Sequence, residues 1–365
     1  MEIRAAVCRA THVPVGIESI DIDRPLSREV LVRTVATGVC HSDLHVVDGD
    51  GRFALDRGIV LGHEGAGIVE AVGDQVTGIR PGDHVVACLS GFCGSCAQCL
   101  SGHPNVCVGG AVARGESAPP RLSKKGQGIP SFAGIGSYAE RMLLHENSVV
   151  KIDDDLPLDR AALVGCGVLT GVGAALRSAG LEAGQTVAVF GCGGVGLSIV
   201  QGARIGGARQ IIALDRFDGK LEMARRVGAT HVVNTSNDDP VEAVRALTGR
   251  AGVDHAFEAV GNTTLVRQAI ESLAVRGTAT IVGVLPPDSK IEFPWMAIRP
   301  ECRVQTSRMG GNRFRIDIPR YLDFYRQGRL LLDEMVTRRG RLDDLNEAFR
   351  AMKAGEVART VLTFD

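Results

Sequence analysis

The stretch "TVAVFGCGGVG", residues 186–196, constrains the fold more than any other part of this chain. Three of its glycines have GxGxxG spacing, directly after a short apolar strand and at the start of a predicted helix, "GVGLSIVQGARIGG". Glycines so placed let the backbone approach a pyrophosphate at a helix N-terminus, although the motif also makes tight turns that bind nothing. The cofactor contacts expected here are Gly191, Gly193, Gly194, Val195 and Gly196.

The segments around the motif favour the nucleotide-binding interpretation. Strand and helix patterns alternate through "RQIIALD", "KLEMARRVGA", "HVVN", "HAFEAVG" and "TATIVGV". This is typical of an α/β fold with a doubly wound parallel sheet. Asp215 ends the strand after the motif, where a carboxylate accepts both ribose hydroxyls and repels a 2′-phosphate. The sequence therefore favours NAD over NADP, with Arg216 as the residue that suits NADP.

The two ends of the chain have a different sequence pattern from the middle. Before about residue 170, short runs rich in Val, Ile and Gly alternate with turns, as in a barrel-like β domain. The last segment carries amphipathic helices and closes on the strand "ARTVLTF", predicted to return to the first domain. We expect a domain over 1–167, completed by 309–365, and a nucleotide-binding domain over 168–308. The segment 109–130 is predicted to be an exposed excursion.

Charge and composition exclude several classes of partner. Of the residues, 45% are hydrophobic, and 41 Lys and Arg balance 42 Asp and Glu. This balance gives no general attraction to nucleic acid or membrane surfaces. The start of the chain, "MEIRAAVCRA", lacks the apolar stretch of a signal peptide or a membrane span, so we expect a cytoplasmic protein. Because that compartment keeps thiols reduced, the 10 cysteines indicate metal or redox chemistry.

Four cysteines gather in "CGSCAQCLSGHPNVC", as CxxCxxC with a fourth seven residues later. Short spacings of this kind wrap four thiolates tetrahedrally around one ion, which favours zinc. A four-iron cluster is the alternative, but the long final gap and the lack of a following proline fit it poorly. Four protein ligands leave no open position, so the predicted site is structural. Its ligands are Cys93, Cys96, Cys99 and Cys107.

A metal centre that turns over substrate needs other ligands. The segments "GVCHSDLH" and "LGHEGAG" supply Cys40 and His63, a thiolate and an imidazole suited to an open zinc site. A histidine near a glycine-rich turn is equally often a core residue. The segment "GCGVLTG" offers Cys166 as a third ligand, but spacing alone does not select it.

At these motifs the chain resembles a known family. The segment "GHEGAGIVEAVGDQVTGIRPGDHV", residues 62–85, is similar to the signature of the zinc-containing alcohol dehydrogenases of the medium-chain dehydrogenase/reductase superfamily. The other motifs follow in the family's order, so the resemblance covers essentially the whole chain. It implies a GroES-like β-barrel catalytic domain and a Rossmann coenzyme domain. The matching positions are Gly62, His63, Glu64, Gly67, Gly73, Val76, Gly82, Asp83 and Val85.

The resemblance also implies roles for single residues. Cys40, His63 and Cys166 become the catalytic zinc ligands, and Asp43 holds the histidine ligand. Glu64 approaches the metal during ligand exchange. Two further roles form a proton relay, in which Ser42 takes the substrate proton and His45 passes it to solvent through the cofactor ribose. His41 and Arg359 face the pyrophosphate, Lys220 the adenosine ribose, Thr170 and Val284 the nicotinamide, and Val260 is a further cofactor contact.

The substrate is less constrained. The resemblance places Leu89, Phe132 and Tyr138 in the pocket, an apolar set that suits a primary aliphatic or aromatic alcohol oxidised to its aldehyde. Core packing is the alternative role for all three. A basic loop with Arg114, Arg121, Lys124 and Lys125 suggests instead an anionic substrate such as S-(hydroxymethyl)glutathione, although "DGDGRFALD" departs from that pattern.

Further alternatives concern the type of activity and assembly. A secondary-alcohol dehydrogenase is possible within the family, whereas a zinc-free reductase lacks the cysteine loop. A nucleotide-binding sensor without turnover is opposed by the complete set of catalytic residues. We expect two zinc ions per chain, NAD as cofactor, and a small alcohol or aldehyde as the only partner besides the chain itself. We also expect a homodimer or homotetramer, since relatives pair through the coenzyme-domain sheet.

Overall fold

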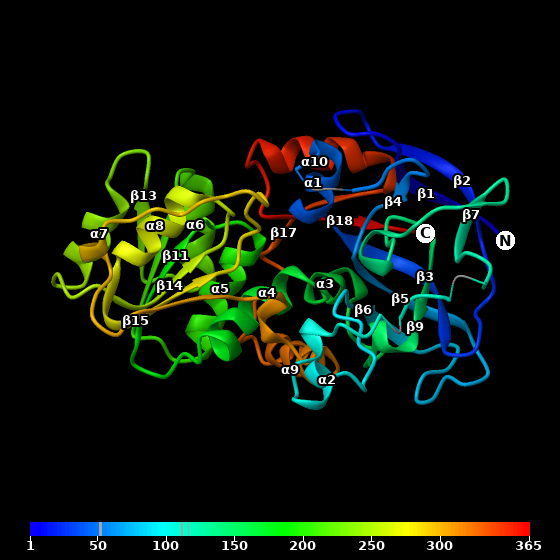
Figure 1. Cartoon of the computed structure of the whole chain (residues 1–365), viewed down its shortest axis with the longest axis horizontal. Helices are drawn as coiled ribbons and strands as arrows, with labels where there is room; N and C mark the ends of the chain where they lie inside the picture. Colours follow the sequence, from blue (N-terminus) through cyan, green and yellow to red (C-terminus); the bar gives the residue numbers. More distant parts are fainter. Residues whose placement is uncertain (51–52, 111, 116) are drawn as a thin grey trace. The chain divides into compact units, whose positions relative to one another are not determined.

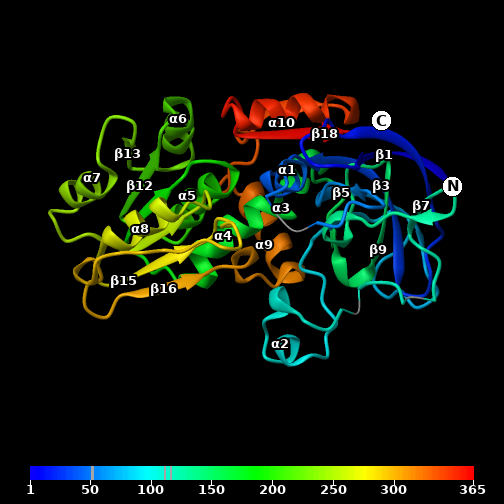
Figure 2. The same cartoon turned by 45° about the horizontal axis from the view of Figure 1, so that its top comes forward.

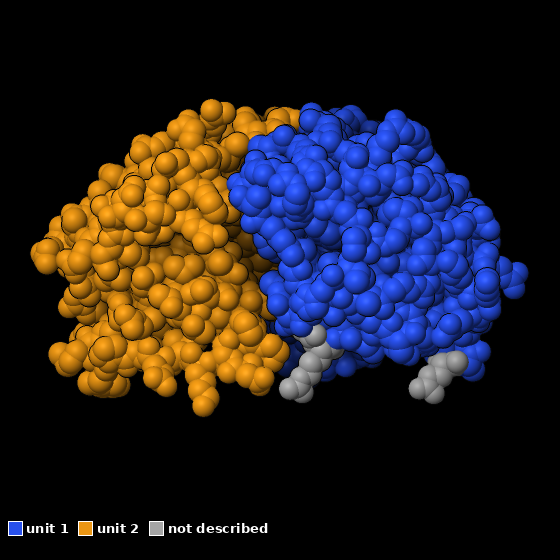
Figure 3. Space-filling view, turned by 90° about the horizontal axis from the view of Figure 1, so that it is seen from above, with its two compact units in different colours: residues 1–166, 313–325, 336–365 blue, residues 167–312, 326–335 orange. Residues whose placement is uncertain are grey.

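The computed structural model describes residues 1–50, 53–110, 112–115 and 117–365 of the chain. It divides into two compact units, coloured separately in Figure 3. The first unit comprises Met1–Cys166, Arg313–Tyr325 and Val336–Asp365, and the second comprises Gly167–Asn312 and Arg326–Met335.

The first unit is built on two antiparallel-rich sheets. One has the strand order β4-β1-β2-β7-β8, and the other has β10-β6-β5-β3-β18-β17, with β9 also paired to β3. These strands are β1 (Glu2–Cys8), β2 (Gly16–Ile22), β3 (Glu29–Gly38), β4 (Ile59–Val60), β5 (Glu64–Val72), β6 (His84–Ala87), β7 (Leu122–Lys124), β8 (Gln127–Gly128), β9 (Arg141–His145), β10 (Val149–Ile152), β17 (Val336–Gly340) and β18 (Arg359–Thr363).

Strand β18 brings the end of the chain into the middle of the second sheet. It pairs antiparallel with β3, Val361 opposite Gly38, and parallel with β17 (Figure 1). Its residues Val361 and Leu362 are fully buried, so the strand is part of the core. The predicted return of "ARTVLTF" to the first domain is confirmed.

Short helices cover these sheets. In α10, the apolar Leu345, Ala348 and Phe349 recur at helical spacing and are buried, whereas the charged residues lie outside. The loop that carries α2 stands away from the sheets of its unit in Figure 2. The helical segments are α1 (His41–Asp48), α2 (Ala97–Leu100), η1 (Pro104–Val106), η2 (Phe132–Gly134), η3 (Glu146–Ser148), α3 (Leu158–Val164), α9 (Phe314–Arg326), η7 (Leu342–Asp344) and α10 (Leu345–Lys353).

The segment 109–130 is only partly the exposed excursion that the sequence predicts. Its second half forms the hairpin β7–β8, which pairs with β2 and extends the first sheet. Leu122 of this hairpin is buried in the core of that sheet. Residues 111 and 116 of the segment lie outside the described part of the chain.

The second unit contains one parallel sheet with the order β13-β12-β11-β14-β15-β16 (Figure 1). The order reverses at β11, whose five residues are all buried, and helices α5 with α6 and α7 with α8 contact one another in pairs. The elements are α4 (Gly167–Gly173), η4 (Ala174–Ser178), β11 (Thr186–Phe190), α5 (Gly194–Ile205), β12 (Gln210–Asp215), α6 (Asp218–Val227), β13 (His231–Asn234), α7 (Pro240–Leu247), β14 (Val253–Glu258), α8 (Thr263–Glu271), β15 (Leu273–Ile281), η5 (Trp295–Ala297), β16 (Arg303–Thr306) and η6 (Met309–Gly311).

Two boundaries differ from those expected. Residues 326–335 belong to the second unit, because the Leu331 amide donates to the Gln201 side chain of α5 at 2.6 Å and Arg204 donates to the Arg329 carbonyl at 2.7 Å. Strand β14 ends at Glu258, before the end of "HAFEAVG", because that buried carboxylate accepts the amides of the residues that follow and turns the chain.

Among the described residues, no single helix has the length and apolarity needed to cross a membrane. Two consecutive helical segments, Leu158–Val164 and Gly167–Ser178, are together long and apolar enough but are bent relative to each other, and they pass this test by length and composition only.

Candidate active site and metal centres

Three ligands separated by more than a hundred residues meet inside the first unit. The side chains of Cys40, His63, Glu64 and Cys166 are buried, and their ligand atoms all lie within 4.8 Å of one another. Cys40 precedes α1 at the end of β3, His63 precedes β5, and Cys166 follows α3. The fold thus places Cys166 beside Cys40 and His63, a proximity that sequence spacing does not predict.

The donor set fits a zinc ion. His63 Nε2 is buried and has no hydrogen-bond partner within the described ranges, and His63 offers a ring nitrogen within 4.8 Å of the sulfur and oxygen ligand atoms of the group. The hydrogen bond from Cys166 holds the pKa of the Cys40 thiol well below its usual value, although burial opposes this, and His63 adds to the lowering. Two sulfurs, one imidazole nitrogen and a nearby carboxylate are the set that an open zinc site uses.

Asp43 supports the histidine of this group. Its carboxylate is fully buried, and Oδ2 lies 3.1 Å from His63 Nδ1. The other oxygen, Oδ1, accepts the Gly62 amide at 2.7 Å. Metal-binding histidines are oriented in this way by a carboxylate on the second ring nitrogen. Asp43 therefore lies against His63, the residue that the resemblance implies it holds.

Glu64 forms a buried ion pair with Arg359 of β18. The pair lies against Gly38, where an added Cβ would come within 2.0 Å of Glu64 Oε2. Only a glycine leaves room for the carboxylate here. The Arg359 side chain is 5% exposed, so this cation is held inside the first unit and is not a solvated surface charge.

The predicted proton-relay residues lie on the first turns of α1. Ser42 Oγ is 3.8 Å from Cys40 Sγ, beside the metal group. His45 Nδ1 lies 2.9 Å from Asp50 Oδ2, so one ring nitrogen of His45 is engaged by a carboxylate. His41 is the exposed first residue of the same helix.

The four-cysteine loop forms a second group in the first unit. Its sulfur atoms also lie within 4.8 Å of one another, with Cys96 Sγ 3.5 Å from Cys99 Sγ. The amides of Ser95 and Cys96 donate to Cys93 Sγ and lower the pKa of that thiol to about 6, which favours the thiolate. Among the described residues this group holds four sulfurs and no other ligand atom, which fits a closed tetrahedral zinc site.

The glycine turn of the second unit has the geometry of a nucleotide-binding loop. Gly191 has φ of +97°, and a Cβ there would come within 2.3 Å of Val260 Cγ2. A Cβ on Gly196 would meet the Gly191 carbonyl at 1.8 Å. Helix α5 begins at Gly194, so its free amides face the turn.

Asp215 is fixed at the end of β12. Its carboxylate accepts the amide of Cys192 at 2.8 Å and that of Phe217 at 3.1 Å. Arg216 and Lys220 both lie over the Phe217 ring, at 4.7 and 5.0 Å from its centroid. The Asp215 carboxylate, which we predict to bind the ribose, thus contacts the glycine turn and lies near the cations Arg216 and Lys220.

Three further predicted cofactor contacts also lie in the second unit. The amide of Val260 donates to Glu258, and the Val260 side chain is exposed, as is Val284. The Thr170 hydroxyl donates a hydrogen bond to Met309 Sδ at 3.4 Å.

Comparisons with known proteins bear on both units. An alcohol dehydrogenase GroES-like domain model matches residues 27–154, and a zinc-binding dehydrogenase model matches residues 194–327. The S-(hydroxymethyl)glutathione dehydrogenase of Haemophilus influenzae is 38% identical over 371 residues, 99% of this chain and 97% of that relative. The chain is a zinc-containing alcohol dehydrogenase of the medium-chain dehydrogenase/reductase superfamily.

Further relatives cover the chain end to end. The Saccharomyces cerevisiae protein named S-(hydroxymethyl)glutathione dehydrogenase is 38% identical over 99% of this chain and 96% of its own length. The crystal structure of benzyl alcohol dehydrogenase from Acinetobacter calcoaceticus matches with a TM-score of 0.91 and 31% identity, over 100% of both chains. The alcohol dehydrogenase is thus an oxidoreductase with the predicted two-domain fold.

The pocket predicted for this alcohol dehydrogenase is only partly assembled. Phe132 packs edge-on against the ring of His63, with centroids 5.4 Å apart. Phe53, which the sequence reasoning missed, packs against Phe132 at 5.9 Å and is 38% exposed. Phe53 belongs to the stretch "DGDGRFALD", of which residues 51 and 52 lie outside the described part of the chain. Leu89 is half-buried against a separate core cluster.

Tyr138 lies elsewhere than the pocket prediction places it. Its side chain is 0% exposed and packs in the core of the first unit with Leu61, Phe349 and Leu362. A side chain enclosed in this way presents no surface to a substrate. Its hydroxyl instead donates to Asp43 Oδ2 at 2.9 Å.

The basic loop does not form a free cationic surface. Arg114 pairs with Glu29 at 2.6 Å and with Asp23 at 2.7 Å, and Arg121 also pairs with Glu29 at 2.7 Å. The Arg114 side chain is only 8% exposed. Lys124 likewise pairs with a carboxylate of β2, Glu18. These three cations therefore fasten the loop to its own sheet, whereas Lys125, the fourth cation of the loop, is exposed.

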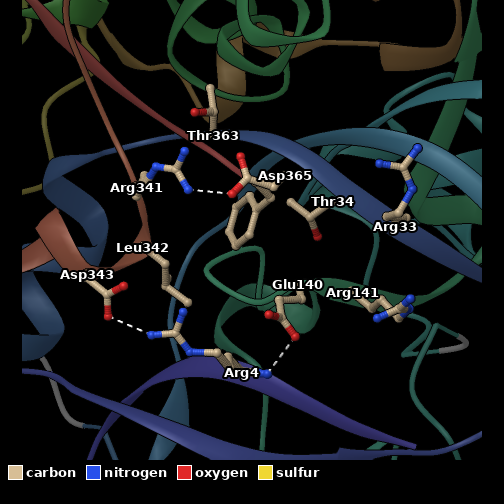
Figure 4. Close-up of a pocket in the computed structure, with 11 residues that line it drawn as sticks. Arg4, Arg33, Thr34, Glu140, Arg141, Arg341, Leu342, Asp343, Thr363 and Asp365 are labelled. Carbon is tan, nitrogen blue, oxygen red and sulfur yellow. Dashed lines mark hydrogen bonds and ion pairs between the residues drawn. The ribbon is translucent and has the colours of Figure 1, made fainter.

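A separate cavity of about 280 Å³ in the first unit contains none of the metal-group residues (Figure 4). Four arginines line it, and three of them pair with carboxylates: Arg4 with Asp343 at 2.7 Å, Arg141 with Glu70 at 2.7 Å, and Arg341 with Asp365. Internal ion pairing leaves little net charge for a ligand, so we assign this cavity no part in the site.

Proposed function

We propose that this chain oxidises an alcohol by hydride transfer to NAD, and that S-(hydroxymethyl)glutathione is its preferred substrate. The buried group formed by Cys40, His63 and Cys166 is the single observation that carries the proposed chemistry. Full-length relatives at 38% identity that bear this substrate in their name support the choice of substrate. The proposal includes two zinc ions per chain and a homodimer or homotetramer in the cytoplasm.

A zinc ion bound by the buried group supplies a Lewis acid that polarises the alcohol or carbonyl oxygen. The chain's own residues do the rest of the positioning. Asp43 holds the His63 ring by its second nitrogen. The Ser42 hydroxyl, beside Cys40, would accept the substrate proton while releasing its own, and His45 would pass that released proton to solvent. Glu64 and Arg359 neutralise each other's charge as a buried ion pair beside this group.

The aromatic pair beside the zinc ligand favours a second candidate substrate, a benzyl-type alcohol. Phe132 and Phe53 form an apolar wall next to His63. Benzyl alcohol dehydrogenase is also among the structural neighbours above 30% identity. With the basic loop engaged in internal ion pairs, the glutathione adduct is supported by the relatives alone.

A substrate panel tests the proposal and separates the two candidates. NADH formation is followed with formaldehyde plus glutathione, with benzyl alcohol and with butanol. The proposal expects kcat/KM to be at least about tenfold higher for the glutathione adduct than for the other two. Turnover of benzyl alcohol without turnover of the adduct selects the second candidate. No turnover of any alcohol by a protein that holds both zinc ions contradicts the proposed function.

Substitution of Phe132 measures the contribution of the aromatic wall. We expect Phe132→Ala to lower kcat/KM for benzyl alcohol about 10- to 100-fold, because the substrate ring loses its apolar partner beside His63. Butanol, which has no ring, serves as the internal control and should lose much less. An equal loss with both alcohols would show that Phe132 acts through the folded state and not through the substrate ring.

Coenzyme choice is assigned to Asp215. We expect Asp215→Ala to lower kcat/KM for NAD about 10- to 100-fold and to raise the relative use of NADP, because a charged acceptor of ribose hydroxyls is lost. Since Asp215 also accepts two backbone amides, Asp215→Asn is the matched variant that keeps an acceptor and removes only the charge. An unchanged NAD to NADP ratio in both variants would remove Asp215 from this role.

A further inference from the structure

Tyr138 is placed where a hydroxyl can act on the metal group without touching it. It lies just before β9 in the first unit, and its side chain has no exposed surface. Backbone hydrogen bonds and a ring contact fix the position of Tyr138. Its amide donates to the Leu61 carbonyl at 3.0 Å and its own carbonyl accepts the Ala6 amide at 2.8 Å. The ring itself packs edge-on against Phe349 at 6.3 Å.

The hydroxyl of this fixed ring points at Asp43. It donates to Oδ2 at 2.9 Å, whereas the next acceptor, the Gly38 carbonyl, is 3.3 Å away. Burial, together with the charge of Asp43, holds the pKa of Tyr138 well above its usual value, so the hydroxyl keeps its proton. A hydrogen bond between a neutral donor and a buried carboxylate is among the stronger ones in a protein interior.

The same carboxylate carries the contact to the metal ligand. Asp43 Oδ2, which accepts from Tyr138, is also the oxygen 3.1 Å from His63 Nδ1. The Gly62 amide holds the other oxygen at 2.7 Å, so the carboxylate cannot rotate without breaking one of these bonds. A chain of contacts therefore runs from Tyr138 through Asp43 to His63, entirely within the first unit.

We propose that Tyr138 is a positioning residue of the buried metal centre, whose hydroxyl fixes Asp43 against His63 Nδ1 and so keeps His63 Nε2 turned toward Cys40 and Cys166. The inference rests on the proposed function only in that this centre holds zinc. Loss of an outer partner of a ligating histidine typically weakens metal binding 10- to 100-fold. The effect of Tyr138 passes through Asp43, so we expect it at the lower end of this range.

Release of zinc to a chromogenic chelator, 4-(2-pyridylazo)resorcinol, tests this without any substrate. The wild-type holoprotein should release zinc in two kinetic phases, and the phase missing from Cys40→Ser belongs to the buried centre. Tyr138→Phe removes only the hydroxyl oxygen. We expect it to accelerate that phase about tenfold and to leave the other phase unchanged. With cobalt in the buried centre, the visible absorption bands should also shift.

Ser137→Ala is the matched control. The Ser137 hydroxyl is also buried and bonded to Thr37 at 2.7 Å, next to Tyr138 in the chain but outside the contacts of Asp43. This variant should release zinc at the wild-type rate, with circular dichroism and melting confirming that both variants fold. If Ser137→Ala accelerates the phase as much as Tyr138→Phe, the effect is loss of packing, and the proposal is overturned.

A double variant tests whether Tyr138 acts through Asp43. Asp43→Asn should accelerate the buried phase by itself, and adding Tyr138→Phe should then change the rate little, because the carboxylate is already gone. An additional tenfold in the double variant would overturn the proposed route. If the enzyme turns over alcohol and Tyr138→Phe leaves the phase unchanged, the inference fails alone. If the phase responds but no alcohol is oxidised, the proposed function fails alone.

Discussion

Cys40→Ser is expected to abolish turnover while leaving the fold intact. Cys40 supplies one of two thiolates to the buried group, and a serine hydroxyl stays protonated and binds zinc weakly. Lewis-acid stabilisation is worth several kcal/mol of the barrier, so kcat/KM should fall by about a thousandfold or more. The measurement is NADH formation with the best alcohol of the panel, alongside circular dichroism.

The control for Cys40→Ser is a buried cysteine outside both metal groups. Cys8 Sγ donates to the Ala10 carbonyl at 3.4 Å, a bond that a serine hydroxyl can keep. Cys8→Ser should therefore retain activity within a few-fold of wild type. A Cys40→Ser enzyme with wild-type kcat/KM would remove Cys40 from the reaction.

Cys99→Ser is expected to lower stability and not the chemistry of the remaining folded enzyme. The four sulfurs of its group form a closed set, so loss of one thiolate opens a site whose binding energy belongs to folding. A loss of about 3 kcal/mol or more corresponds to a fall in Tm of about 10 °C for a unit of this size. Thermal melting by circular dichroism is the measurement.

Cys302→Ser is the matched control for this variant. Cys302 lies in the second unit, and its thiol donates to the Ala274 carbonyl at 3.2 Å. Since serine can keep that bond, its Tm should stay within a few degrees of wild type. An unchanged Tm in Cys99→Ser with full zinc content would mean that the loop does not depend on this thiolate.

Local patterns predicted the parts of the fold that depend on local physics. The glycine turn is required by the close approach of Gly196 to the Gly191 carbonyl, and such a requirement is visible in sequence spacing. The short cysteine loop is likewise a local feature, since its four sulfurs meet within fifteen residues. The strand that returns from the chain's end was predictable from its apolar run and its terminal position.

Contacts between distant segments were not readable in the same way. Cys166 meets Cys40 and His63 because α3 ends beside β3 and β5, and spacing carries no sign of that. Arg114, which the sequence suggested as part of a cationic surface, pairs with Glu29, 85 residues away, and attaches the loop to its own sheet. The resemblance to the family placed Tyr138 in the pocket, and nothing in the neighbouring sequence reveals that its hydroxyl meets Asp43.

The central claim is that one chain holds two zinc ions of different kinds, an open one in the group of Cys40, His63 and Cys166 and a closed one in the cysteine loop. The most direct measurement is zinc per chain by atomic emission in the purified protein and in the two variants Cys40→Ser and Cys99→Ser. We expect two zinc ions in the native protein and one in each variant. A native protein that oxidises alcohol with a single zinc ion, or a Cys40→Ser variant that retains both, would contradict it.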